Sequence, residues 1–274
     1  MSLAPGRPSS DETWLVQALR DAIEADGIDI AIQPRIVLSD GRLAGFKSLA
    51  RWVRADGTAV APRTFVALAE RYQLLALLGE RVLERTLLQL ADWRDRGLHV
   101  MPVAVNFLTQ QFHPVETVER VARALARFDV PAELLELELT DGLLVGDREA
   151  AMRSLKLLAD LGVNLTIDRF GTGHSALVYV RRLPIYRTKI DRHLVRDMVD
   201  QPLADRDLVK LIIRLAHRMQ LRCVATGIET PEHLALLREL GCDEGQGYAV
   251  GRPATPEAIT ELLERESSSE LVAP

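Results

Sequence analysis

The sequence predicts an α/β fold, specifically a modified (β/α)8 barrel with one antiparallel strand. Short apolar segments alternate with amphipathic helical patterns over most of the chain, and such alternation is typical of a mostly parallel sheet. Eight predicted strands within about 250 residues favour a closed, TIM-like barrel over an open sheet. A hairpin joins the first two predicted strands, so one of them should run antiparallel to the rest.

Each predicted strand is a short apolar or alternating run that ends at a turn or a polar side chain. The first strand is predicted to stop at Pro34, and Ser-Asp-Gly-Arg at 39–42 predicts the hairpin turn. The predicted strands cover residues 28–33, 43–49, 101–106, 134–139, 163–168, 186–190, 221–226 and 244–248.

The predicted helices show apolar residues at helical spacing and suitable residues at their ends. Pro62 suits a first helical turn, and Gly162 and Gly241 suit the turns that end helices. The predicted helices cover residues 11–25, 62–72, 75–96, 114–128, 147–161, 175–182, 203–219, 231–240 and 255–264.

The length of 274 residues suits one barrel or two small domains, and we expect one barrel domain at residues 11–265. Residues 1–10 read as a linker or expression remnant, and residues 266–274 as a disordered Ser/Glu-rich tail. The net charge of -5 gives no general attraction to nucleic acid polymers. No apolar run is long enough to span a membrane, so we expect a cytoplasmic domain without membrane contact. Cys223 and Cys242 form no metal motif and read as reduced core thiols.

Polar side chains close the predicted strands at their carboxyl ends. They include an amide, two carboxylates and a lysine: Asn106, Glu138, Asp168 and Lys189. The carboxyl ends of parallel strands meet at one mouth of a barrel, where active sites form. The pattern therefore predicts a site suited to metal ions and phosphate groups.

The chain resembles the EAL domains, which hydrolyse the bacterial second messenger cyclic di-GMP, over roughly residues 11–265. The resemblance rests on short strings in a fixed order. These are Gln33-Pro34, Leu49-Ala-Arg51-Trp52, Val105-Asn106, Glu138-Leu-Thr140, Ile167-Asp168, Phe170-Gly-Thr-Gly173, Lys189-Ile-Asp191-Arg192, Ala225-Thr-Gly-Ile-Glu229-Thr230, Gln246-Gly-Tyr248 and Arg252-Pro253.

The resemblance implies a role for each matched position. Active members bind two divalent cations, usually Mg²⁺ or Mn²⁺, and the metal-ligand positions here are Asn106, Glu138 and Asp168. Lys189 matches a lysine that orients the attacking water, and Arg51 an arginine that pairs with a ligand phosphate. The implied ligand-binding positions are Gln33, Lys47, Leu49, Arg51, Asn106, Asp168, Arg169, Lys189, Gln246 and Pro253.

Three departures from the EAL pattern fall on acidic metal-binding positions. Lys47 stands where the family has the glutamate of Glu-Ala-Leu, Arg169 replaces an aspartate, and Thr226 replaces a glutamate. These changes make the site about five charge units more positive, which opposes cation binding. Asp141 and His174 also differ from the family pattern.

We therefore expect a catalytically degenerate EAL domain that acts as a cyclic di-GMP receptor or regulatory module. No catalytic set is intact; Lys189, Gln246 and Glu229 are vestiges, and Lys47 with Arg169 would supply the charge of the missing cations. Two alternatives stay open: a residual phosphodiesterase that uses Mg²⁺ or Mn²⁺ to form linear pGpG, and a protein-binding scaffold without nucleotide. The resemblance is also compatible with a homodimer and with an unidentified protein partner.

Simpler roles compete at several of these positions. Lys47 could point to solvent, and Arg169 could pair with Asp168 or Glu138 and block the pocket. Asn106 and Asp168 could cap the helices that follow them. Glu229 reads as a supporting residue, and His113, His174 and His193 read as loop or surface histidines.

Overall fold

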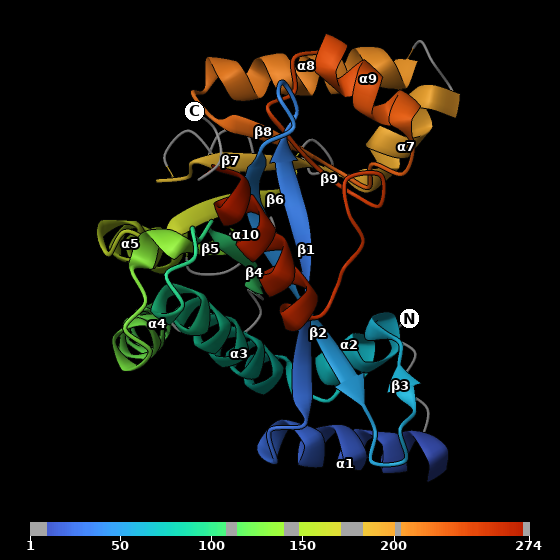
Figure 1. The fold of residues 1–274 in the computed structure, drawn as a ribbon. Coiled ribbons are helices and arrows are strands. Elements are labelled where there is room, and N and C mark those ends of the chain that lie inside the picture. The colour runs from blue at the N-terminus through green and yellow to red at the C-terminus, as the bar shows by residue number, and fades with distance from the viewer. Residues whose placement is uncertain (1–9, 108–113, 140–147, 171–182, 201–203, 271–274) are drawn as a thin grey trace.

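The computed structural model describes residues 10–107, 114–139, 148–170, 183–200 and 204–270, and its strands form a barrel surrounded by helices (Figure 1). Strand order in the sheet is β1-β9-β8-β7-β6-β5-β4-β2-β3, and a further β1–β2 pairing closes the ring with only β3 outside it. The strands are β1 (Ile28–Val37), β2 (Leu43–Val53), β3 (Ala59–Val60), β4 (Val103–Phe107), β5 (Leu135–Leu139), β6 (Asn164–Phe170), β7 (Arg187–Ile190), β8 (Arg222–Thr226) and β9 (Glu244–Gln246).

Strand β1 is antiparallel to both of its neighbours, β2 and β9, and the pairings from β2 through β4 to β9 are parallel. The predicted barrel with one antiparallel strand is thus confirmed. The two-residue strand β3, which pairs with the outer end of β2, was not predicted.

The predicted end of the first strand at Pro34 is wrong, because β1 continues to Val37. Pro34 lies opposite Phe46, whose N–H bonds to Pro102 on the β4 side and not to β1. This is a non-hydrogen-bonded pair of the β1–β2 ladder, so the missing N–H of proline breaks no bond there. The register shifts just afterwards, between Arg35 and Ile36.

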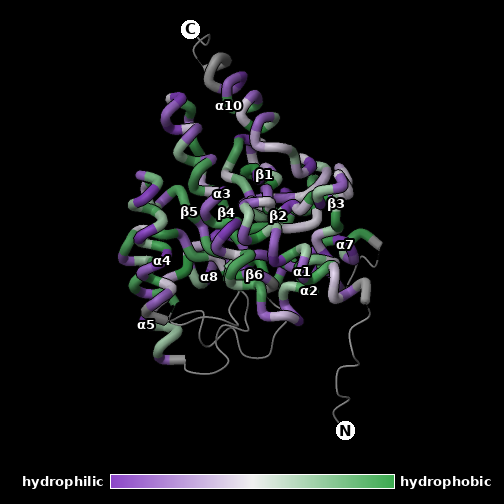
Figure 2. The backbone as a smooth tube through the Cα atoms, turned by 90° about the horizontal axis from the view of Figure 1, so that it is seen from below, coloured by the Kyte–Doolittle hydropathy of each residue, from purple (hydrophilic) through white to green (hydrophobic). Residues whose placement is uncertain are grey.

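Helices pack around the outside of the barrel, and along helices such as α4 hydrophobic and hydrophilic residues alternate turn by turn (Figure 2). Their apolar faces are buried against the strands. The described helices are α1 (Ser10–Glu24), α2 (Pro62–Arg71), α3 (Leu75–Asp95), α4 (Pro114–Arg127), a short 3-10 turn η2 (Ala132–Leu134), α5 (Arg148–Asp160), α7 (Arg192–Asp200), α8 (Ala204–Arg218), α9 (Pro231–Glu239) and α10 (Pro256–Glu270).

Helix α7 was missed by the sequence prediction. It is short, and it forms because Val195 and Met198 supply a buried face while the Asp191 carboxylate accepts the N–H of His193 at its start. His193 is exposed in α7, which agrees with its interpretation as a surface histidine. The predicted helix at 175–182 lies outside the described residues.

The remaining observations concern the last helix, the two cysteines and the length of the helices. Helix α10 extends to Glu270, beyond the predicted start of the tail at residue 266, and the Trp93 indole of α3 bonds to Thr260 of α10 at 2.8 Å. Cys223 and Cys242 are buried free thiols. No described helix combines the length and apolar character needed to cross a membrane.

Candidate functional site

A cavity of about 680 Å³ opens at the carboxyl ends of the barrel strands. Alternating residues of each strand point inward, and the strand register brings Gln33 opposite Lys47 and Asn106 opposite Glu138. Ten predicted or discussed site residues line this cavity together: Gln33, Lys47, Leu49, Asn106, Glu138, Asp168, Lys189, Thr226, Glu229 and Gln246.

Other predicted site residues lie elsewhere. Arg51 follows Leu49 on the same face of β2, but it does not line the cavity, and its guanidinium bonds to the Ala50 carbonyl at 2.9 Å. Burial lowers the pKa of Arg51. Pro253 also lies outside the cavity wall. The side chain of Arg169 lies outside the described residues, as do Asp141, His113 and His174.

Glu138 of β5 is the centre of the site, and each of its carboxylate oxygens binds a different ammonium group. Lys47 of β2 contacts Oε2 at 2.6 Å, and Lys189 of β7 contacts Oε1 at 2.5 Å. The Glu138 side chain is fully buried, whereas that of Lys47 retains 15% exposure. Burial alone would raise the pKa of Glu138, but the two lysines outweigh it and hold the pKa at about 2.

The two lysines differ in their surroundings. Burial, together with the charge of Lys47, lowers the pKa of Lys189 despite its contact with Glu138. Burial also disfavours the charged form of Lys47, but Glu138 and then Asp168 outweigh it, so the pKa of Lys47 is raised. Lys47 is therefore a cation directed at the two carboxylates and not a lysine that points to bulk solvent.

Amide side chains extend the contacts of Lys189 across the barrel. Its ammonium donates to Gln246 at 3.1 Å, Gln246 donates to Gln33 at 3.2 Å, and Gln33 donates to the Gly251 carbonyl at 2.9 Å. Thr226 donates its hydroxyl to the Ile190 carbonyl at 2.8 Å. The series of hydrogen bonds from Lys189 through Gln246 to Gln33 connects the antiparallel strand β1 to β7 and β9.

The oxygen donors of the cavity do not fit a pair of divalent cations. Such ions need several vacant oxygen ligands, preferably carboxylates, yet both oxygens of Glu138 hold ammonium groups. An ammonium group donates hydrogen bonds and cannot coordinate a metal. Within the described part of the chain, no three His, Cys, Asp or Glu side chains are grouped to hold a metal ion.

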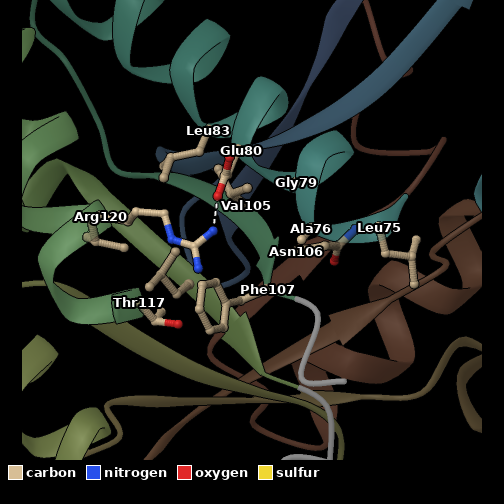
Figure 3. Close-up of a pocket in the computed structure, with 12 residues that line it drawn as sticks. Leu75, Ala76, Gly79, Glu80, Leu83, Val105, Asn106, Phe107, Thr117 and Arg120 are labelled. Atoms are coloured by element: carbon tan, nitrogen blue, oxygen red, sulfur yellow. Dashed lines mark hydrogen bonds and ion pairs between the residues drawn. The ribbon is translucent and has the colours of Figure 1, made fainter. Parts of the chain in front are cut away.

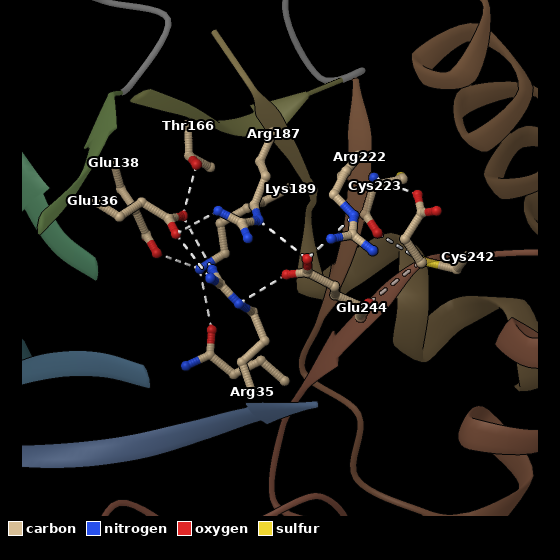
Figure 4. A network of polar contacts seen from close by, with 12 residues as sticks. Arg35, Glu136, Glu138, Thr166, Arg187, Lys189, Arg222, Cys223, Cys242 and Glu244 are labelled. Carbon is tan, nitrogen blue, oxygen red and sulfur yellow. Dashed lines mark hydrogen bonds and ion pairs between the residues drawn. The ribbon is translucent and has the colours of Figure 1, made fainter. Parts of the chain in front are cut away.

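A second charged ring lies inside the barrel, one layer below the site, and was not predicted (Figure 4). Arg35 forks onto both oxygens of Glu136 at 3.0 and 2.8 Å, and Arg187 bridges Glu136 and Glu244 at 3.1 Å each. Arg35 also reaches Glu244 at 2.9 Å, and Thr166 donates to Glu136 at 2.6 Å. We call Arg35, Glu136, Arg187 and Glu244 the floor ring.

The floor ring was missed because Leu-Glu-Leu-Glu-Leu of β5 looks like a strand with one solvent-facing side. All five residues are buried, since the glutamates face the barrel interior and the leucines face the helices. The available signal was the placement of Arg35 in β1 and Arg187 in β7, each two residues from a residue of the site, Gln33 or Lys189.

A smaller apolar pocket, about 80 Å³, lies between helices α3 and α4 and strands β4 and β5 (Figure 3). An ion pair between Glu80 and Arg120 bridges the two helices beside it. Asn106 and Phe107 line both this pocket and the large cavity. The two spaces therefore share the end of β4 as a wall.

Known proteins similar to this chain point to one family. The EAL domain model matches residues 16–253. The cyclic di-GMP phosphodiesterases PA2567 and NbdA of Pseudomonas aeruginosa are each 35% identical to this chain; the matches cover 92% and 93% of it but only 43% and 32% of those proteins. The chain thus spans less than half the length of these curated relatives. The PaMucR phosphodiesterase structure in complex with c-di-GMP superposes with a TM-score of 0.83 at 33% identity, covering 90% of this chain and 99% of that one.

Proposed function

This chain belongs to the EAL domain family, and on that premise we propose that it binds cyclic di-GMP without hydrolysing it, as a receptor or regulatory module. The observation that carries the proposal is the double ion pair at Glu138, whose two oxygens hold Lys47 and Lys189. A carboxylate engaged in this way is withdrawn from metal coordination, while the surrounding cavity stays open.

Electrostatics supports the loss of hydrolysis. Two like charges about 4 Å apart repel by ~4 kcal/mol at an effective dielectric of ~20. A divalent ion beside Glu138 would meet this repulsion from Lys47, which stands where the family has a glutamate. Thr226 adds no carboxylate to offset it. A two-metal mechanism, which stabilises attacking and leaving oxygens together, then lacks its ions.

Residues retained in and beside the cavity support nucleotide binding. Gln33 and Leu49 line the cavity, and Arg51 follows on the same strand face with the planar donor fork that suits a phosphate. The PaMucR structure, which is similar over most of this chain, is a c-di-GMP complex. In this proposal the domain acts in the cytoplasm, and its output passes through an unidentified protein partner or a homodimer.

Calorimetric titration with cyclic di-GMP in EDTA, combined with a turnover assay in Mn²⁺, tests the proposal. We expect binding at ligand concentrations on the order of tens of micromolar and no linear product. Turnover with Mn²⁺ would instead select the residual phosphodiesterase. If neither binding nor turnover occurs, the domain is a protein-binding scaffold.

Two variants and one control variant sharpen this test. Arg51→Ala should abolish cyclic di-GMP binding, while Arg96→Ala, an exposed arginine at the end of α3, should leave it unchanged. Unchanged affinity of Arg51→Ala would remove that residue from the site. Lys47→Glu alone should not restore hydrolysis, because Arg169 and Thr226 still supply no carboxylate; measurable turnover would contradict this metal argument.

A further inference from the structure

We infer that His233, which does not line the cavity, is a positioning residue for one part of the cavity wall. The part that it positions is the connection between β8 and α9, residues 227–230, which we call the β8–α9 segment. Gly227 and Glu229 of this segment line the cavity, whereas His233 lies in α9 and is buried. The inference concerns the backbone of this chain, and it rests on the proposed function only where cyclic di-GMP serves as the probe.

One ring nitrogen of His233 binds the end of the β8–α9 segment. Its Nδ1 accepts the backbone N–H groups of Glu229 and Thr230, each at 3.3 Å. The hydroxyl oxygen of Thr230 in turn accepts the N–H of His233 at 3.3 Å. A backbone N–H can only donate, so Nδ1 is the unprotonated nitrogen, and the proton of the neutral ring lies on Nε2.

This arrangement reaches further than an ordinary capping box. In that motif a glutamate or glutamine at the third helical position accepts the N–H of the residue that caps the helix, which is Thr230 here. The His233 ring also accepts the N–H of Glu229, one residue earlier. Because two successive N–H groups converge on one acceptor atom, the ring fixes the direction of the backbone between Glu229 and Thr230.

The β8–α9 segment is held on its β9 side by Ile228. The N–H of Ile228 donates to the Gln246 carbonyl at 3.2 Å, and the Ile228 carbonyl accepts the N–H of Ala249 at 2.9 Å. Glu229 comes next in the chain, and its N–H is bound by His233. The direction in which Glu229 enters the cavity wall therefore depends on this ring.

The acceptor nitrogen can be checked in the parent chain, without any substitution. In a long-range proton–nitrogen NMR spectrum of the histidine rings, His233 should show the tautomer with the proton on Nε2 and none on Nδ1. A proton on Nδ1 would overturn the inference, because that nitrogen could then accept neither backbone N–H.

Two substitutions separate the acceptor from the packing of the ring. His233→Leu removes the acceptor, so hydrogen exchange at the Glu229 and Thr230 amides, measured by NMR without nucleotide, should accelerate at least about tenfold. His233→Gln keeps an acceptor at the third helical position and should keep the Thr230 amide protected. Thr255→Ala is the matched control: it removes a cap from α10, where Thr255 accepts the N–H of Ala258 at 3.4 Å, and it should leave both amides unchanged.

Titration with cyclic di-GMP measures the consequence for the cavity. If the segment keeps its position in only about a tenth of the molecules, the apparent Kd rises about tenfold, and we expect a rise of this size for His233→Leu. His233→Gln should bind more tightly than His233→Leu, and Thr255→Ala should match the parent.

The inference is overturned if a folded His233→Leu keeps the exchange rates or the Kd of the parent. It is also overturned if His233→Gln loses protection at Thr230 as fully as His233→Leu, or if Thr255→Ala accelerates exchange at Glu229 to the same extent. A parent chain that binds no cyclic di-GMP would contradict the proposed function, and the tautomer and the exchange rates would still decide the role of His233.

Discussion

The barrel interior contains two charged rings, and they are built differently. In the floor ring, the planar guanidinium groups of Arg35 and Arg187 clamp Glu136 and Glu244, and all four side chains are buried. In the upper ring, formed by Lys47, Glu138 and Lys189, the two ammonium groups share the Glu138 carboxylate, and Asp168 also attracts the charge of Lys47. The Lys47 side chain lines the cavity. The lower ring is matched in charge and closed, whereas the upper ring is directed toward the space where a ligand would sit.

The comparison shows how position within one barrel separates structure from function. Guanidinium forks satisfy carboxylates with fixed geometry and suit buried networks, whereas an ammonium group is a compact charge on a flexible stem. Removing a partner from the closed ring should therefore affect folding most. Changes in the upper ring should affect both folding and what the cavity binds.

The largest expected effect comes from Glu136→Gln, which removes the carboxylate shared by Arg35 and Arg187. Breaking a buried ion pair from one side leaves charge uncompensated, so we expect a loss of about 3–5 kcal/mol in the free energy of unfolding. Denaturant unfolding monitored by circular dichroism measures it. Arg206→Ala, which breaks the exposed pair with Glu239, should cost less than about 1 kcal/mol. Equal losses in both variants would contradict the special role of the floor ring.

Glu138→Gln should produce a loss of about 3 kcal/mol at neutral pH, because the pKa of Glu138 is about 2 in the folded chain against an ordinary value of 4.5. A lowered pKa stabilises the folded state fully above pH 4.5, and this contribution disappears as the pH falls from 4.5 to 2. The stability difference between parent and variant should therefore shrink across that range. Unfolding curves at successive pH values measure it, and a constant difference would show that Glu138 does not titrate as expected.

Gly45→Ala tests the packing that positions Arg35 and should cost about 1–3 kcal/mol. Gly45 has φ of 154°, and an added Cβ would lie 2.8 Å from the Arg35 guanidinium and from the Pro102 carbonyl. Gly79→Ala is the matched control, because its Cβ would meet no atom within 4 Å in helix α3, and the change should be neutral or stabilising. Thermal unfolding ranks the two variants, and a neutral Gly45→Ala would mean that the floor ring adjusts freely.

The sequence predicted the barrel well because its signals are local. The alternation of strands and helices, the hairpin after Pro34 and the polar strand ends each depend on a few neighbouring residues. The shared placement of Asn106, Glu138, Asp168 and Lys189 followed from the rule that parallel strands end at one mouth.

What the sequence did not predict depends on partners far apart in the chain. The Lys47–Glu138 contact joins residues 91 positions apart, and the Arg35–Glu136 contact joins residues 101 positions apart. Periodicity shows which side of a strand a residue faces, but not whether that side is interior or solvent. For the same reason the burial of Glu136 was not predicted, and α7 was too short to stand out from its surroundings.

The floor ring closes the barrel interior below the cavity. With Glu136 and Glu244 fully buried and Arg35 only 1% exposed, the floor ring fills the barrel interior below the cavity in the part of the chain that the structure describes. Whatever enters the cavity must leave by the same mouth, past the strand ends and the residues that follow them.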